Sequence, residues 1–172
     1  MTKTCTTLPV AMSISNEISK SCLAYVSTRI LITNATGSSL RLIDSKNLQG
    51  RVTRYPFEEI IENGQLGISL HHPESSTFSG SEGAAIYRDE TNGLDIGIFW
   101  SVPYEGNNRW DVIVKKQGIW EEKKQWIQAF KGLVKKDMTQ SDRSTFQHGL
   151  EIRCSMQNIR KPILNVVIMK HK

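Results

Sequence analysis

Residues 95–114, with the sequence DIGIFWSVPYEGNNRWDVIV, decide the fold of this chain. The stretch holds two short apolar runs rich in β-branched and aromatic side chains, one before and one after the segment PYEGNN. The proline, glycine and asparagines between them predict two strands joined by a connection longer than a tight turn. Trp100, Tyr104 and Trp110 lie in or beside this connection. Such rings suit either the end of a β-sandwich core or a contact with a ligand or a membrane.

More short apolar runs, separated by turn residues, lie on both sides of this stretch. Together they predict strands at residues 30–32, 40–43, 60–61, 66–70, 83–87, 94–100, 110–115, 150–156 and 163–169. The turn residues Asn63 and Gly64 predict a hairpin between the third and fourth of these strands, and residues 91–93 predict another between the fifth and sixth. Many short strands with regular turns indicate a sandwich or barrel rather than an α/β fold.

An amphipathic segment precedes the strands. Near the N-terminus, apolar residues recur at every fourth position and predict a short helix, which either packs on the domain or detaches and inserts into lipid. The apolar positions of this segment are Ile14, Ile18, Cys22 and Val26. The chain is therefore expected to divide into an N-terminal segment, residues 1–28, and a β-domain, residues 29–172.

A second amphipathic segment extends from Ile119 to Val134, where apolar residues at spacings of three, four and seven predict a helix. Gly132 offers an alternative, earlier end to this helix. Trp120 falls outside the apolar stripe. Its position suits either an anchor at a membrane surface or an ordinary half-buried side chain.

Size and charge limit the classes of function. The 172 residues, 38% hydrophobic and 23% charged, suit one soluble domain, and no apolar run is long enough for a transmembrane helix. The net charge of +5 favours anionic partners, but no nucleic-acid-binding motif accompanies it, so nucleic acid is not an expected partner. Because no apolar signal sequence is visible, the protein is expected to be cytoplasmic or secreted as a mature form, soluble until it meets a membrane.

The sequence lacks patterns typical of catalysis or metal binding. Cys5, Cys22 and Cys154 form no pair with zinc-ligand spacing and are expected to be reduced thiols. None of the four histidines has a metal-ligand spacing, and His71 and His72 are expected to point to opposite faces of a strand. The sequence thus predicts a protein that is not an enzyme, with no catalytic residue, no metal and no cofactor.

Several segments, in order and at nearly constant spacing, resemble actinoporins, a family of membrane-binding cytolysins. Residues 99–104, FWSVPY, resemble the family's FxSVPYD segment. Further similar segments are residues 32–37, 80–87, 110–112, 120–132 and 149–164. Residues 55–57, 61–65 and 80–87 also resemble plant jasmonate-induced proteins and fungal sphingomyelin-binding lectin-like proteins.

The actinoporin resemblance implies a mainly β fold, a β-sandwich of two antiparallel sheets flanked by an N-terminal helix and one internal helix. It also implies binding to a membrane lipid such as sphingomyelin, insertion of the N-terminal helix, and assembly of copies of the chain into a cytolytic, defensive pore. In actinoporins the serine and proline of the SVP segment and a cluster of tyrosines hold a phosphocholine headgroup. The residues that the resemblance assigns to this site are Ser101, Pro103, Tyr104, Trp110, Trp120 and Lys124.

This chain departs from actinoporins at the headgroup site itself. The aromatic-rich insertion after SVPY is shortened, Lys124 and Gln125 stand at the paired tyrosine positions, and Glu82 replaces an apolar residue. Each missing ring removes about 0.5–2 kcal/mol of cation–π attraction for a choline group. Lys124 and Glu82 instead favour a more polar or anionic headgroup, or a sugar. The alternative function is a non-lytic, lectin-like or stress-induced module that binds a glycan or a lipid headgroup.

Overall fold

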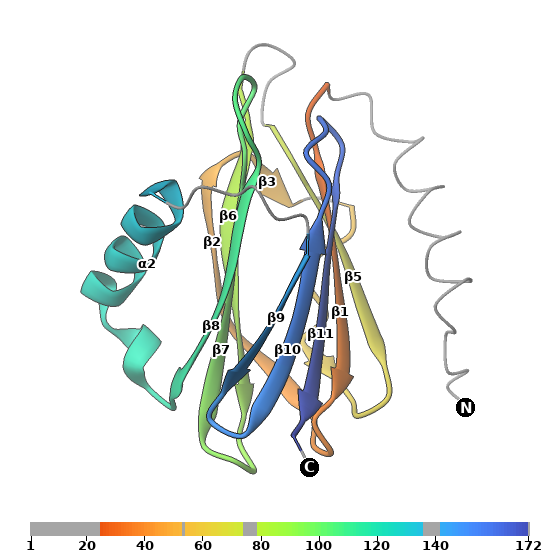
Figure 1. The fold of residues 1–172 in the computed structure, drawn as a ribbon, viewed down its shortest axis with the longest axis vertical. Coiled ribbons are helices and arrows are strands. Elements are labelled where there is room, and N and C mark those ends of the chain that lie inside the picture. Colours follow the sequence, from red (N-terminus) through yellow and green to blue (C-terminus); the bar gives the residue numbers. More distant parts are fainter. Residues whose placement is uncertain (1–24, 53, 74–78, 136–141, 172) are drawn as a thin grey trace.

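The computed structural model describes residues 25–52, 54–73, 79–135 and 142–171. They form two β-sheets packed face to face, with one helix on the outer side of the second sheet (Figure 1). The six-stranded sheet has the order β3 (Arg51–Val52), β5 (Leu66–His72), β1 (Thr28–Ala35), β11 (Ile163–Lys170), β10 (Leu150–Met156) and β9 (Asp142–Gln147). The five-stranded sheet has the order β4 (Ile60–Ile61), β2 (Leu40–Gln49), β6 (Ser81–Asp89), β7 (Leu94–Val102) and β8 (Arg109–Lys116). The predicted β-sandwich is confirmed.

Strand pairing departs from the sequence prediction in two places. β1 lies between β5, which is antiparallel to it, and β11, which is parallel to it, so the six-stranded sheet is not purely antiparallel. The hairpin predicted across Asn63 and Gly64 is wrong, because β4 pairs with β2 while β5 pairs with β1. That turn crosses from one sheet to the other. The Asn34 side chain at the end of β1 holds it by donating to the carbonyl of Ile61 at 2.8 Å.

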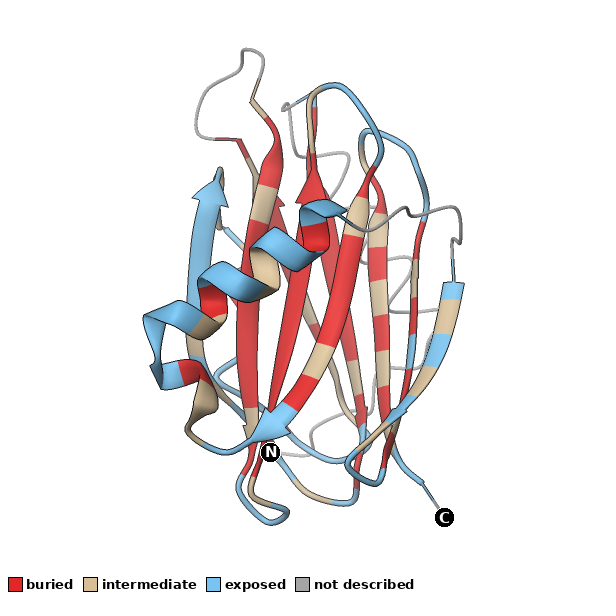
Figure 2. Cartoon of the chain, turned by 60° about the vertical axis from the view of Figure 1, so that its left-hand side comes forward, coloured by how far each residue is buried: buried red, intermediate tan, exposed pale blue. Residues whose placement is uncertain are grey.

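The hairpin predicted at residues 91–93 is confirmed and forms the centre of the five-stranded sheet. β6 and β7 pair along their whole length, and Gly93 takes the positive φ of 63° that the turn requires. All residues of β7 are buried, because one face of the strand packs in the core and the other lies near the helix (Figure 2). The core between the sheets includes Ile30, Leu40, Tyr87, Ile98, Trp100 and Ile168.

The internal helix is interrupted near its predicted start. A 3₁₀ turn, η1 (Ile119–Glu121), precedes α2 (Lys123–Lys135), and Glu122 between them has extended backbone angles. The apolar stripe drawn from the sequence assumed one continuous helix, whereas the extended residue changes the direction of the chain. Trp120 therefore packs inward, with only 5% of its surface exposed. Gly132 does not end the helix, which continues to Lys135.

The sequence prediction missed β9. This strand, DRSTFQ, is polar, and its one large apolar residue, Phe146, is exposed, so it lacks the apolar signal of the other strands. It forms a hairpin with β10 through His148 and Gly149, which have φ of 50° and 79°. Two successive residues with positive φ are what a type I′ turn requires.

Candidate functional site

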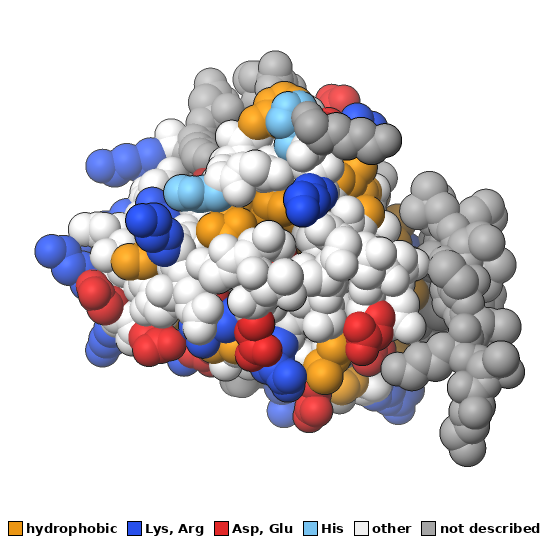
Figure 3. Space-filling view, turned by 90° about the horizontal axis from the view of Figure 1, so that it is seen from below, with side chains coloured by type: hydrophobic (Ala, Val, Ile, Leu, Met, Phe, Trp, Pro, Cys, Tyr) orange, Lys and Arg blue, Asp and Glu red, His pale blue; other side chains and the backbone are white. Residues whose placement is uncertain are grey.

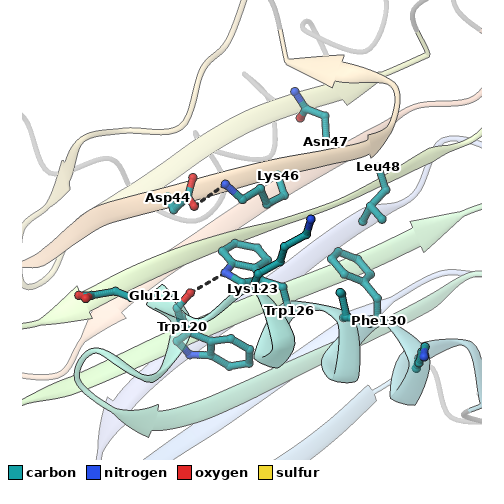
Figure 4. Close-up of a pocket in the computed structure, with 11 residues that line it drawn as sticks. Asp44, Lys46, Asn47, Leu48, Trp120, Glu121, Lys123, Trp126 and Phe130 are labelled. Carbon is teal, nitrogen blue, oxygen red and sulfur yellow. Dashed lines mark hydrogen bonds and ion pairs between the residues drawn. The ribbon is translucent and has the colours of Figure 1, made fainter.

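A groove of about 810 Å³ opens between α2 and β2 on the outer side of the five-stranded sheet (Figure 4). The apolar residues that line it are Leu48, Trp120, Trp126, Ile127 and Phe130. The polar residues are Asp44, Lys46, Asn47, Glu121, Lys123 and Lys131. Its volume lies within the range of about 300–1,000 Å³ that is usual for small-molecule sites. Three lysines and two carboxylates around aromatic rings make this groove amphipathic.

β2 forms one wall of the groove through an irregular pairing with β6. The register shifts between Asn47 and Gln49, so Leu48 is the extra residue of a β-bulge, and its side chain is exposed. Bulges re-aim side chains in this way and are frequent beside functional sites. Lys46 forms an ion pair of 2.6 Å with Asp44, and its ammonium lies 5.4 Å from the centre of the Trp126 ring.

The floor of the groove is a cluster of aromatic rings between α2 and the sheet. Phe99 of β7 contacts the rings of Trp120, Trp126 and Phe130, with centroids 5.2–6.1 Å apart. The indole N–H of Trp126 donates to the carbonyl of Trp120 at 2.6 Å, which ties α2 to η1. Space for Trp120 depends on Gly97, where an added Cβ would lie 3.0 Å from the Trp120 ring.

A largely buried ion pair fastens η1 to the sheet. The Asp95 carboxylate accepts hydrogen bonds from Arg88 at 2.7 and 3.0 Å and from the backbone N–H of Gly118 at 2.8 Å. Arg88 also donates to Glu121 at 3.2 Å. The pKa of Arg88 is raised above its ordinary value, chiefly by its hydrogen bond to Asp95. The position of Trp120 at the groove is therefore set by the sheet as well as by the helix.

The resemblance assigns Ser101 to the headgroup site. Ser101 of β7 pairs across the sheet with Glu82 of β6, and Glu82 pairs with Gln49 of β2. Gln49 directly follows Leu48, the last β2 residue that lines the groove. The Ser101 hydroxyl is buried and donates to the Glu82 carboxylate at 2.7 Å. A phosphate at this point would meet a carboxylate and a hydroxyl that already has an acceptor. The pair therefore favours a cationic or hydroxyl-bearing group over a phosphate.

Pro103 and Tyr104 lie at one end of the sandwich, which we call the loop end. It is formed by the β7–β8 connection, residues 103–108, and the β10–β11 connection, residues 157–162. Both residues line a second cavity of about 360 Å³. The Tyr104 ring also packs on Tyr25, with centroids 5.7 Å apart.

The other predicted headgroup residues do not gather in one place. Trp110 is buried in the core, 5.0 Å from the Arg143 guanidinium, and lines neither cavity. Lys124 is exposed on α2 but is not among the groove residues. Of these residues only Trp120 lines the groove, and only 5% of its surface is exposed. Nothing in the sequence marks Lys46 as a site residue, and Trp126 is predicted only as part of an apolar helix face.

The residues predicted to insert into a membrane are described only in part. Ile14, Ile18 and Cys22 lie outside the residues that the structure describes. Val26 is fully buried in the core between the sheets, just ahead of β1. It is therefore an anchor of the sandwich rather than an exposed position on a free helix.

A serine–histidine pair is buried between the sheets. His71 Nδ1 lies 2.8 Å from Ser81 Oγ, which lies 2.7 Å from the hydroxyl of Thr28. Burial, with a smaller contribution from His72, lowers the pKa of His71 to about 4. Because these side chains are fully buried, a substrate has no access to them. His71 is buried while His72 is partly exposed, which confirms that they point to opposite faces.

Neither a metal cluster nor a spanning helix is found within the described ranges. No group of three or more histidine, cysteine, aspartate or glutamate side chains is placed there to hold a metal ion. No helix in this part of the chain is both long enough and apolar enough to cross a membrane. Cys154 lies in β10, as predicted, and its burial raises the pKa of the thiol.

Two comparisons by sequence identify relatives of this chain. The model of the Nakanori-like protein family matches residues 10–171. A 23 kDa jasmonate-induced protein of Hordeum vulgare is 30% identical over 105 residues, which cover 59% of this chain and 50% of that protein. The chain thus spans about half the length of this curated relative. The predicted resemblance to jasmonate-induced proteins is confirmed, whereas that to actinoporins stays a prediction.

Solved structures show the same fold. The lipid binding protein Nakanori aligns with a TM-score of 0.80 and 19% identity, over 93% of this chain and 78% of that one. The Xerocomus chrysenteron lectin XCL aligns with a TM-score of 0.55 and 9% identity, over 83% of this chain and 97% of the lectin.

Proposed function

Because the chain belongs to the Nakanori-like protein family, we propose that it is a non-enzymatic protein that binds membrane lipid, with the groove between α2 and β2 as its headgroup site. The observation that carries this proposal is an apolar aromatic floor and three lysines in one open groove. A relative of the same fold, the lipid binding protein Nakanori, supports it.

The groove offers separate contacts for each part of a lipid. Leu48 and Ile127 are exposed beside it and suit the apolar region below a headgroup. Lys123 and Lys131 form no ion pair with any described residue and can donate to a phosphate. The Asp44 carboxylate suits an ammonium group. A groove with both signs of charge fits a zwitterionic headgroup such as that of sphingomyelin.

The double variant Lys123→Gln/Lys131→Gln is expected to weaken binding to phosphatidylcholine vesicles that contain sphingomyelin by about tenfold or more. Each lost hydrogen bond to a phosphate costs roughly 1.5 kcal/mol or more, and glutamine preserves the helix. Co-sedimentation with the vesicles measures the affinity. The control is Lys115→Gln/Lys116→Gln, an equal change of charge at the exposed far end of β8. If both double variants lose the same affinity, net charge alone drives binding and the groove is not the site.

A glycan is the second candidate for the same groove. The Asp44 carboxylate and the Lys46 ammonium, which lies over the Trp126 ring, offer an acceptor and a donor for sugar hydroxyls beside an apolar surface. The lectin of the same fold favours this candidate. Two results would indicate carbohydrate binding instead of lipid binding. In the first, free sugars displace the protein from vesicles; in the second, a glycan array captures the protein while vesicles do not.

Pore formation is a further step that we propose for the N-terminal segment, because its apolar residues recur at helical spacing. Deleting residues 1–24 is expected to abolish the release of dye from sphingomyelin vesicles while co-sedimentation persists. The deletion stops before Val26, which is in the core, and before Ser27, whose N–H donates to the carbonyl of Arg160 at 3.1 Å. A full-length chain that sediments without release would be a non-lytic binding module. Release that persists after the deletion would place the pore elsewhere in the chain, and assembly of copies is checked by cross-linking on the vesicle.

A further inference from the structure

The cavity at the loop end is distinct from the groove and shares no lining residue with it. It lies between the β7–β8 and β10–β11 connections and measures about 360 Å³. Pro103, Tyr104, Asn108, Asn158, Ile159 and Arg160 line it. Its residues come from segments about 50 positions apart in the chain, so only the folded sandwich forms it.

Hydrogen bonds fix the β10–β11 connection just before Arg160 and at Arg160 itself. The Asn108 side chain donates to the carbonyls of Gln157 at 2.9 Å and Ile159 at 2.7 Å. The Arg160 carbonyl accepts from the backbone N–H of Ser27 at 3.1 Å. The backbone beside the cavity is therefore held in one conformation before any ligand arrives, which reduces the entropy lost on binding.

The Arg160 side chain is held by aromatic rings rather than by a carboxylate. Its guanidinium carbon lies 3.8 Å from the centre of the Tyr25 ring and 5.6 Å from that of Tyr104. No described residue forms an ion pair with Arg160, although it is exposed at the cavity. Stacking on the ring face orients the planar guanidinium of Arg160. Its N–H groups, which lie along the edge of this plane, can then donate two parallel hydrogen bonds to an oxyanion.

The surroundings of Arg160 suit a membrane surface. Tyr25 and Ile159 flank it with 50% and 56% of their surfaces exposed. A tyrosine ring favours the headgroup layer, and an exposed apolar side chain favours the lipid region just below it. At the opposite end of the sandwich, basic, acidic and hydrophobic side chains are interspersed (Figure 3). We infer that Arg160, stacked on Tyr25 and Tyr104, binds the phosphate of a membrane lipid at the loop end. This would be a second lipid site, in addition to the groove. This inference rests on the proposed membrane binding but not on the groove.

Glu105 is expected to lower the affinity of this second site for phosphate. It is exposed and lines the same cavity, so its negative charge repels an incoming phosphate. Removing the charge of Arg160 and removing that of Glu105 must therefore change phosphate binding in opposite directions. Neither effect is expected for a charge at the far end of the sandwich.

The test compares vesicles of phosphatidylcholine with and without phosphatidic acid, whose headgroup is an exposed phosphate. Arg160→Gln is expected to reduce affinity for the phosphatidic acid vesicles about fivefold, the effect of one basic residue at an anionic surface. Arg160→Lys keeps the positive charge but lacks the paired N–H donors of a guanidinium. It is therefore expected to recover only part of the affinity that Arg160→Gln loses. Glu105→Gln is expected to increase the affinity, and Lys116→Gln is the charge-matched control. The groove variant Lys123→Gln/Lys131→Gln should keep the dependence on Arg160.

Each other outcome is informative. Equal losses in Arg160→Gln and Lys116→Gln would reduce the site to a net charge effect and overturn the inference. NMR titration of the full chain with inorganic phosphate tests Arg160 without a membrane. A response of the loop end to phosphate, without any effect of Arg160→Gln on vesicles, would make it a site for soluble anions and not for lipid. If the wild-type protein binds no vesicle of either composition, the proposed function fails, and the same titration still decides whether Arg160 holds a phosphate.

Discussion

Replacing Asp95 with asparagine is expected to lower the free energy of unfolding by about 3–5 kcal/mol, the usual cost of removing one partner from a buried ion pair. Asp95 is fully buried, and its two oxygens accept from Arg88 twice and from Gly118 once. Asparagine has a single oxygen, so its NH₂ group would face an N–H donor where an acceptor is needed. Urea-induced unfolding, followed by tryptophan fluorescence, measures the loss.

The matched control is Asp44→Asn, the same chemical change in the ion pair with Lys46 at the surface. It is expected to cost at most about 1 kcal/mol, because water solvates both partners and screens their attraction. A loss in Asp95→Asn no larger than that of Asp44→Asn would contradict the role assigned to the buried pair. Because Asp95 anchors η1, its loss is also expected to loosen Trp120 at the groove.

Acidification is expected to remove about 3 kcal/mol of stability through His71 alone. Its pKa is lowered from 6.5 to about 4 in the folded protein, mainly by burial and further by His72. The unfolded chain therefore binds a proton at a pH where the folded one does not, and the free energy of unfolding falls as the pH drops from 6.5 to about 4. Above this window the contribution is fully present. Urea unfolding at a series of pH values measures the slope.

Two neighbouring variants isolate this contribution. His71→Gln is expected to flatten the slope between pH 6.5 and about 4 relative to the wild type. His72→Gln replaces a partly exposed ring and is expected to keep most of it. If His71→Gln does not fold, NMR titration of the His71 ring in the wild type gives the pKa directly. A value near 6.5 would mean that burial does not hold this ring neutral.

The sequence predicts the sandwich because its strongest signals are local. The β6–β7 hairpin has two short apolar runs separated by the turn residues Asn92 and Gly93, and the structure places both strands and their pairing as predicted. β9 has no comparable signal, since it is held by its neighbour β10 rather than by apolar side chains of its own. The error at Asn63 and Gly64 has a different cause. A turn that crosses between sheets has the same residues as one that closes a hairpin.

The groove could not be predicted because its two walls are brought together only by the fold. Lys46 and Leu48 come from β2, whereas Trp126 and Phe130 come from α2, some 80 positions later in the chain. Leu48 lines the groove where the strand bulges, and the apolar pattern of β2 does not indicate a bulge. The prediction for Trp120 assumed one continuous helix, in which Trp120 lies outside the apolar stripe. The extended backbone of Glu122 interrupts that helix, so helical spacing does not predict where Trp120 points. The helix itself was predicted from apolar residues at helical spacing.

The parallel pairing of β1 with β11 also sets an order in which the protein can form. β6, β7 and β8 pair with their neighbours in sequence, so they can assemble early on the ribosome at little cost in loop-closure entropy. β1 pairs Arg29 with Ile163, so this edge of the strand has no partner until the last described strand has been synthesised. A nascent chain that waits for β11 presents an open strand edge, which is the kind of surface that chaperones shield from aggregation.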